Sequence, residues 1–253
     1  MARRALVSAL LALILAGAAP VAAATGTAVG VDPEAQAEAG GESRILVVGA
    51  DVQVGERIVT GARGQVQIVF DDQTRLVVGP RSALVIEDYL VRSTGSASKV
   101  AIDALSGSFR FITGNSAKPA YSITTPTGSI GVRGTAFDFA VARGTTAVLL
   151  YHGAVELCSR GGRCVTLARR CEMGAATGAE AFLVNPGTQN RETLTAQFRY
   201  LRSQAPLLAA FRVAETRTCQ QSDSAPAQSL TTGSGDPAPT RPSTGPSSGG
   251  TSR

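Results

Sequence analysis

The side chains of this sequence that could do chemistry are few, and their spacing does not form a catalytic set. His152 is the only histidine, and a general base or metal ligand at this position would need clustered carboxylates beside it. Glu87 and Asp88 could serve glycoside hydrolysis, but adjacent residues of a strand point to opposite faces and cannot flank one bond. The pair Asp71-Asp72 is typical of a turn between strands rather than of a calcium site. We therefore predict a protein that is not an enzyme, with no cofactor and no metal.

The four cysteines, Cys158, Cys164, Cys171 and Cys219, indicate disulfide chemistry instead. Cys158 and Cys164 flank a Gly-Gly loop that suits a hairpin, so they could face each other across two strands. Cys171 would then pair with Cys219 and clamp the C-terminal segment to the sheet domain. Three pairings are open to four cysteines, and sequence alone does not choose among them. A zinc site is the alternative, but the usual close cysteine pairs are missing and an oxidising compartment favours disulfides.

The first 24 residues have the three parts of an export signal. Arg3 and Arg4 precede an apolar stretch from Leu6 to Ala18 that is too short to span a bilayer comfortably. The small residues Ala22-Ala23-Ala24 then offer a cleavage site for signal peptidase. A retained membrane anchor is the alternative. We expect a mature protein without a membrane span, located in the periplasm or cell envelope.

Composition favours short strands and tight turns over long helices. Aromatic residues are 5% and charged residues 17%, while glycine reaches 28 of 253 residues. This profile excludes a collagen, a coiled coil and a protein with many membrane spans. The formal net charge is +5, but the arginines are scattered and are not interleaved with aromatic residues. We therefore predict no binding of nucleic acid.

Turn chemistry divides residues 45–186 into twelve short apolar or β-branched runs, spaced by about ten residues. The pattern predicts an all-β domain of stacked short strands, in the form of a β-sandwich, a barrel or a β-helix-like stack. Residues 99–104 and 107–113 are predicted as separate strands, as are residues 146–151 and 153–158. Residues 25–44 lack a periodic apolar face and are predicted to be a flexible lead-in.

The C-terminal part of the sequence changes character twice. Residues 187–221 are predicted to be helical, because Leu194, Phe198 and Leu201 fall on one face of a helix over residues 192–202. Pro206 is expected to restart this helix rather than end it. Residues 222–253 are rich in serine, threonine, proline and glycine, and are predicted to be a disordered tail.

Two stretches of the strand-rich domain resemble the FecR domain family of exported signalling and envelope proteins. The first runs from Val54 to Leu76 and the second, which is more diagnostic, from Tyr121 to Phe137. The second stretch contains the signature residues Thr125, Pro126, Gly131, Val132, Arg133, Gly134 and Thr135. The resemblance covers about residues 47–184. It implies an all-β periplasmic domain without a catalytic activity of its own.

The signature residues are expected to be structural. Gly131 and Gly134 bracket Val132-Arg133 and would give the backbone the freedom for a tight bend. Pro126 fixes its φ angle and suits a strand edge. Arg133 is expected to be satisfied inside the sheet stack, by neighbouring carbonyl groups or by a carboxylate such as Asp138. The alternative is that Arg133 contacts a partner or a ligand.

These observations favour a non-enzymatic module that binds a protein of the envelope or a component of the cell wall. One alternative is a signalling component that acts in trans in siderophore or iron-uptake regulation, which depends on the family resemblance alone. A second alternative is an envelope protein that binds or acts on polysaccharide.

Overall fold

The computed structural model describes residues 24–91, 97–116 and 121–224, and strands dominate this part of the chain. The predicted export signal up to Ala23 and residues 225–253 of the predicted tail lie outside the described residues. Residues 222–224 of that tail are helical, so the prediction of disorder is wrong there. The strands are β1 (Ala24–Asp32), β2 (Ala35–Ala39), β3 (Glu42–Ile45), β4 (Asp51–Gln53), β5 (Arg57–Thr60), β6 (Gln65–Phe70), β7 (Arg75–Val78), β8 (Ala83–Val91), β9 (Ala97–Ile112), β10 (Tyr121–Thr125), β11 (Gly128–Ala142), β12 (Thr145–Ser159), β13 (Cys164–Leu167), β14 (Met173–Ala176) and β15 (Ala181–Val184). The prediction of an all-β fold is confirmed.

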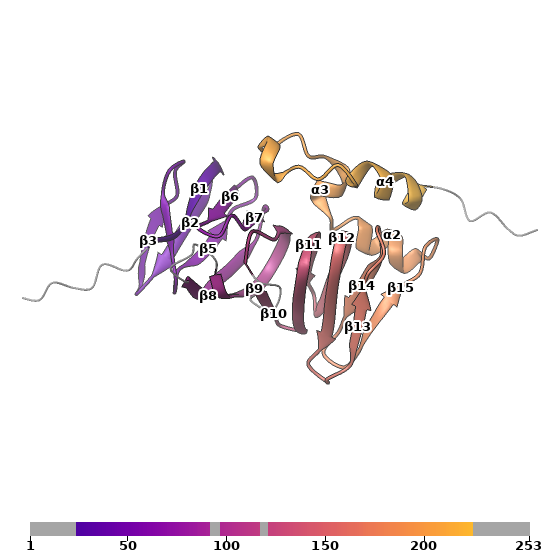
Figure 1. Cartoon of the computed structure of the whole chain (residues 1–253). Helices are drawn as coiled ribbons and strands as arrows, with labels where there is room; N and C mark the ends of the chain where they lie inside the picture. The colour runs from indigo at the N-terminus through magenta and orange to yellow at the C-terminus, as the bar shows by residue number, and fades with distance from the viewer. Residues whose placement is uncertain (1–23, 92–96, 117–120, 225–253) are drawn as a thin grey trace, which may run out of the picture.

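The strands form two layers that share three long members (Figure 1). The first layer has the order β15-β14-β12-β11-β9-β7-β6-β1-β4. The second layer has the order β13-β12-β11-β10-β9-β8-β5-β2-β3. Apolar side chains from both layers, such as Phe109, Phe137, Ile102 and Val132, form one buried cluster between them. The fold is therefore a β-sandwich whose layers are connected through continuous strands.

Glycines bend the three shared strands where they pass from one layer to the other. Gly107 of β9 has a φ of 112°, Gly134 of β11 a φ of 64° and Gly153 of β12 a φ of 85°. These are left-handed values that glycine adopts at little cost. The predictions of separate strands over 99–104 and 107–113, and over 146–151 and 153–158, are therefore wrong: each pair is one bent strand.

Replacement of Gly153 by alanine should lower the free energy of unfolding by about 2–4 kcal/mol, from the positive φ and from overpacking. A Cβ atom at this position would lie 2.2 Å from the carbonyl oxygen of Gly134 and 2.7 Å from Cβ of Thr135. Gly144 is the matched control, because it also has a positive φ, of 74°, but no heavy atom would lie within 4 Å of its Cβ. Denaturant unfolding should show a clearly smaller loss for Gly144→Ala. An equal loss of unfolding free energy in the two variants would contradict the claim that Gly153 is required because a side chain does not fit at the bend.

The prediction that residues 25–44 form a flexible lead-in is wrong, because the structure places β1, β2 and β3 there. β1 pairs with β4 and β6, and β2 pairs with β3 and β5. The inward positions carry Ala28, Ala35 and Ala37, which are almost fully buried. Because alanine has a short side chain, its alternation gives only a weak hydrophobic pattern, and β1 and β2 are not predicted from the sequence.

The helical prediction for residues 187–221 is correct only in part. The helices are α2 (Gln189–Thr195), α3 (Arg199–Arg202) and α4 (Thr216–Ser224), with a 3-10 turn, η3, at Ala209–Phe211. The single helix predicted over 192–202 is broken at Phe198, whose φ and ψ of −86° and 86° lie outside the helical region. Beyond Pro206 the chain forms only the turn η3 rather than a restarted helix. None of the described helices is long and apolar enough to cross a membrane.

This C-terminal segment, defined here as residues 185–224, lies across the outer face of the first layer (Figure 1). Its side chains Leu194, Phe198 and Leu201 pack on β11, β12 and β14 in one buried cluster. Tyr200, Leu207 and Phe211 pack beside Val77 of β7 in another. Apolar burial therefore holds the segment along most of the width of the sheet.

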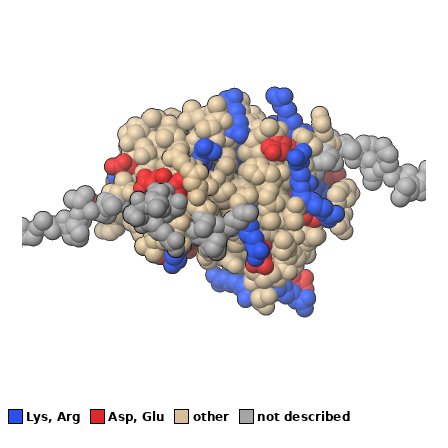
Figure 2. All heavy atoms as spheres, viewed as in Figure 1, with Lys and Arg blue, Asp and Glu red and all other residues tan. Residues whose placement is uncertain are grey.

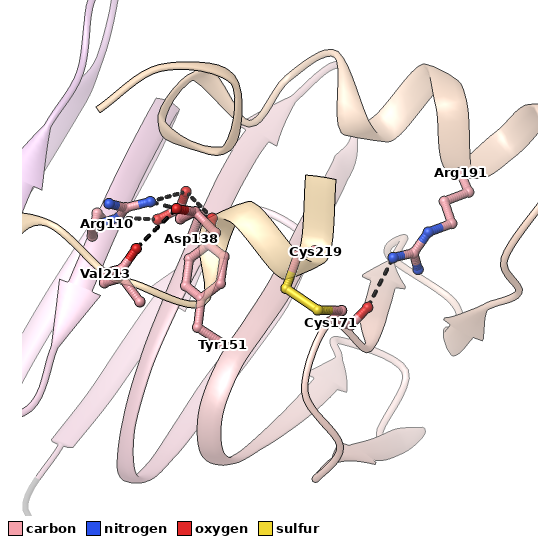
Figure 3. The surroundings of a disulfide bond; sticks show 8 residues. Arg110, Asp138, Tyr151, Cys171, Arg191, Val213 and Cys219 are labelled. Carbon is pink, nitrogen blue, oxygen red and sulfur yellow. Dashed lines mark hydrogen bonds and ion pairs between the residues drawn. A yellow bond between two sulfur atoms is a disulfide. The ribbon is translucent and has the colours of Figure 1, made fainter. Parts of the chain in front are cut away.

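Two disulfides are present, between Cys158 and Cys164 and between Cys171 and Cys219. The first closes the hairpin of β12 and β13, where the two cysteines are directly paired across the strands. The second joins the loop before β14 to α4 and fixes the end of the C-terminal segment to the sandwich (Figure 3).

Candidate functional site

The signature residues lie on β10, on the turn that follows it and on the first half of β11. Thr125 is buried, and its hydroxyl accepts hydrogen bonds from the Gly128 N–H at 3.2 Å and from the Thr146 hydroxyl at 2.9 Å. Pro126 is exposed in the turn between the two strands. Gly128 has no room for a side chain, because a Cβ would lie 1.8 Å from the carbonyl oxygen of Cys158. This part of the signature shapes the turn.

The second half of the signature forms the bend of β11. Val132 is buried in the core between the layers. Thr135 is fully buried; its backbone N–H donates to the Thr113 hydroxyl at 2.9 Å and its own hydroxyl donates to the carbonyl oxygen of His152 at 2.5 Å. Thr135 thus ties the bend of β11 to the end of β9 and to the bend of β12. Gly134 has the positive φ that was expected of a bend residue.

Gly131 does not meet its expectation. Its φ is not positive, and a Cβ at this position would make only ordinary contacts, the nearest at 3.8 Å with Glu156. The backbone freedom for the bend therefore comes from Gly134 and not from Gly131.

The expected burial of Arg133 and its pairing with Asp138 are wrong. Arg133 is exposed, and it makes no hydrogen bond or ion pair with any residue that the structure describes. The physical reason is the bend of β11 at Gly134, which carries the strand from the second layer into the first between Arg133 and Asp138. Arg133 lies beside Ala154 in the second layer, whereas Asp138 lies beside Arg110 in the first layer. The two side chains consequently belong to different faces of the sandwich.

Arg133 extends from the outer face of the second layer, which the C-terminal segment does not cover. We call this surface the open face. Its central positions are small or polar and are exposed or half-buried, namely Ser122, Thr124, Ser129, Gly131, Ala154 and Glu156. The outer face of the first layer has the opposite character, since apolar and helical residues bury it. The two faces of one sandwich therefore have different roles.

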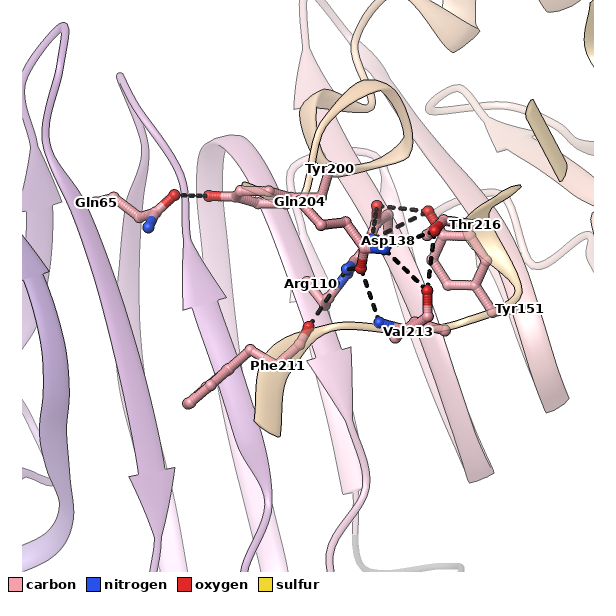
Figure 4. A network of polar contacts seen from close by, with 9 residues as sticks. All are labelled: Gln65, Arg110, Asp138, Tyr151, Tyr200, Gln204, Phe211, Val213 and Thr216. Atoms are coloured by element: carbon pink, nitrogen blue, oxygen red, sulfur yellow. Dashed lines mark hydrogen bonds and ion pairs between the residues drawn. The ribbon is translucent and has the colours of Figure 1, made fainter. Parts of the chain in front are cut away.

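Sequence analysis did not identify a buried ion pair beneath the C-terminal segment. Arg110 of β9 is fully buried and donates to both carboxylate oxygens of Asp138, through Nε at 2.7 Å and Nη2 at 2.9 Å (Figure 4). The Tyr151 hydroxyl donates to the same carboxylate at 2.7 Å. Burial alone would lower the pKa of Arg110, but the charge of Asp138 outweighs it and raises the pKa.

Gln204 connects this ion pair to the C-terminal segment. Its side-chain oxygen accepts hydrogen bonds from Nη1 of Arg110 and from the Val213 N–H, and its nitrogen donates to the Thr216 hydroxyl at 2.7 Å (Figure 4). Every polar group of this network has a partner, so it is suited to fix the segment in place.

A second buried polar cluster surrounds Asp72. Its carboxylate accepts hydrogen bonds from the hydroxyl groups of Thr74 at 2.9 Å, Ser116 at 2.6 Å and Tyr121 at 2.7 Å. The Tyr89 hydroxyl accepts from the backbone N–H of Asp72 at 2.9 Å. Burial is the main reason that the pKa of Tyr89 is raised; the hydrogen bond from the Asp72 N–H lowers this pKa, while the negative charge of Asp72 raises it. This cluster joins the turn after β6 to β8 and β10.

The remaining candidates of the sequence do not converge on a reactive centre. His152 is exposed on the bend of β12. Within the described ranges, no group of three histidine, cysteine, aspartate or glutamate residues is placed to hold a metal ion. The absence of an enzymatic activity and of a cofactor stays a prediction.

Comparison with known proteins gives one family. Residues 56–156 match the model of the FecR protein family. No match was found among curated proteins. Two crystal structures of a putative anti-sigma factor from Parabacteroides distasonis ATCC 8503, at 1.65 and 2.50 Å resolution, are similar, with 16% sequence identity and a TM-score of 0.41. The similarity covers 51% of this chain and 59% of theirs, so the chain spans about three fifths of their length.

Proposed function

On the premise that residues 56–156 are a FecR domain, we propose that the chain is an interaction module of the cell envelope with a regulatory role. Its partner is a protein that docks on the open face around Arg133. The two disulfides support a location in an oxidising compartment outside the cytoplasm.

The observation that carries this proposal is the position of Arg133. Thr125, Val132, Gly134 and Thr135 have structural roles in the turn, the core and the bend. Arg133 has none in the described part of the chain, although it stands in the middle of the signature. An exposed arginine on a surface of small residues can bring a planar cation against a carboxylate or an aromatic ring of a partner. Arginine is also among the residues that dominate the energy of protein interfaces.

The test is photo-crosslinking in intact envelopes, with a photoreactive residue placed at Ser122 or Thr124 on the open face. Mass spectrometry should identify one dominant protein adduct from both positions. The substitution Arg133→Ala should reduce its yield by about tenfold or more, as expected for a central interface arginine. Because Arg133 is exposed and makes no contact with a described residue, the variant should fold normally, which thermal unfolding checks.

Position 143, at the tip of the hairpin between β11 and β12, is the control site for the photoreactive residue. The adduct should be missing from this position. An adduct that is unchanged by Arg133→Ala, or that comes equally from position 143, would contradict the proposal. Adducts with polysaccharide alone would favour the polysaccharide alternative.

Regulation of siderophore or iron uptake in trans stays a prediction. It requires that deletion of the protein and the Arg133→Ala variant change the transcription of iron-uptake genes to the same extent under iron starvation. An unchanged transcription in the deletion strain would remove this role and leave the docking proposal in place.

A further inference from the structure

The C-terminal segment carries three neighbouring pockets that share lining residues. The first, of 410 Å³, lies between the loop before β14 and the end of β15, and Arg191 lines both it and the second, of 330 Å³. Leu201, Arg202 and Gln220 line both the second pocket and the third, of 270 Å³. The shared residues make the three pockets one elongated depression, which we call the arginine groove.

Arginine dominates the charge of this groove. Six arginines line it, against two glutamates, Glu172 and Glu192; the arginines are Arg169, Arg170, Arg191, Arg202, Arg212 and Arg217. Figure 2 shows several blue side chains, with a few red ones among them, over the region where Figure 1 places α2 and α4. Glu172 is already paired with Arg169 at 2.8 Å. The third pocket has no carboxylate among its lining residues.

Some of these arginines are held in position by backbone carbonyl groups. Arg191 donates to the carbonyl oxygen of Cys171 at 2.8 Å, beside the disulfide (Figure 3). Arg212 donates through Nε to the carbonyl oxygen of Leu207 at 2.8 Å, and Arg202 donates to Ala196 at 3.0 Å. A neutral carbonyl orients a guanidinium group without cancelling its charge. Arg191 is almost fully buried, so the oriented positive charge that the groove presents to a ligand comes from exposed arginines such as Arg202 and Arg212.

The arginines at the two ends of the groove have no ion pair with a described carboxylate. Arg170 at one end and Arg217 at the other are both exposed. The disulfide between Cys171 and Cys219 lies along the same path, because Cys171 lines the first pocket and Cys219 lies on α4. The groove thus runs over a covalently fixed part of the fold.

Apolar residues between the arginines limit the chemistry of the ligand. Leu183 and Pro186 line the first pocket and are exposed, whereas Val184 and Leu201 also line the groove but are almost fully buried. Leu183 is 40% exposed, so part of an apolar side chain is available to a ligand. A phosphate-rich or sulfated polymer would use the arginines and leave these apolar surfaces wet. A peptide with both acidic and apolar side chains would use both.

We infer that the arginine groove binds an extended acidic peptide segment of a partner protein, with apolar side chains between its carboxylates. This site is separate from the open face, since it is formed by the C-terminal segment and the loop before β14. It adds a second contact, which gives a partner with two binding regions a higher overall affinity.

The test is a selection of peptides from a random library on the protein with both disulfides formed. The enriched sequences should contain aspartate or glutamate alternating with apolar residues. The affinity of the most enriched peptide, measured by fluorescence anisotropy, should fall by about tenfold or more in Arg170→Glu and in Arg217→Glu, because each substitution reverses one charge of the site. Both variants should be affected if the groove is one continuous site.

Arg163→Glu is the matched control, since Arg163 is an exposed arginine at the hairpin of β12 and β13, outside the groove. It should leave the affinity unchanged, as should Arg133→Ala, which separates this proposal from docking on the open face. The same variants are tested with vesicles that contain phosphatidylglycerol and with heparin. Enrichment of non-acidic peptides, affinities equal in wild type and groove variants, or groove-dependent binding of the vesicles or heparin alone would overturn the proposal.

Discussion

Replacement of Arg110 by methionine should lower the free energy of unfolding by about 3–5 kcal/mol, the loss typical of a broken buried ion pair. Arg110 is fully buried, so its removal leaves the Asp138 carboxylate away from water, with the Tyr151 hydroxyl as its remaining side-chain donor among the described residues. The loss should extend to Gln204, which accepts a hydrogen bond from Arg110 and holds the C-terminal segment. Denaturant unfolding followed by circular dichroism measures this difference.

Two further variants test whether charge burial is the cause. Arg57→Met removes an exposed ion pair with Glu38 and should cost less than about 1 kcal/mol. The double variant Arg110→Met with Asp138→Leu should be more stable than Arg110→Met alone, because the uncompensated charge is gone. A double variant that is less stable than the single one would show that packing, and not charge, accounts for the loss.

A rise of pH above about 10 should destabilise the fold steeply. Burial is the main reason that the pKa is raised for Tyr89, Tyr121, Tyr151 and Tyr200, which are all the tyrosines of the chain. Below pH 10 the folded and unfolded chains hold the same phenolic protons. Above it, the unfolded tyrosines lose theirs while the folded ones retain them, so stability falls as the pH rises. Each tyrosine contributes up to about 1.4 kcal/mol per pH unit.

The absence of tryptophan makes this titration easy to follow by tyrosinate absorbance. The absorbance should stay low past pH 10 and then rise together with the loss of β-sheet circular dichroism. In denaturant the same tyrosines should titrate near pH 10. Tyrosinate absorbance that rises near pH 10 while the fold persists would show that these hydroxyls are accessible in the native state.

The sequence predicts the strands that alternate apolar and polar residues, the pairings Cys158–Cys164 and Cys171–Cys219, and the resemblance to the FecR family, whose model matches residues 56–156. The sequence does not predict the bends within β9 and β12, because a glycine close to two apolar runs has the local pattern of a turn between separate strands. Gly107 and Gly153 continue a strand only because neighbouring strands in two layers pair with both halves of it. Such long-range pairing leaves no local signal.

The position of Arg133 could not be predicted for the same reason. Strand alternation alone places Arg133 and Asp138, which are five residues apart, on opposite faces of one sheet. The irregular register of β11 changes this, so that both side chains point outward, but from different layers. The Arg110–Asp138 pair left a usable signal. Both residues stand between two phenylalanines, in Phe109-Arg110-Phe111 and Phe137-Asp138-Phe139. In paired strands, this matching pattern buries the rings on one side and places opposite charges together on the other.

The disulfide between Cys171 and Cys219 should limit the effect of a single proteolytic cut. It closes a loop with a sequence separation of 48 residues, which contains β14, β15, α2, α3 and η3. One cut anywhere inside this loop opens a ring instead of releasing a fragment. The two pieces stay joined, and the arginine groove keeps both of its walls after a first cleavage.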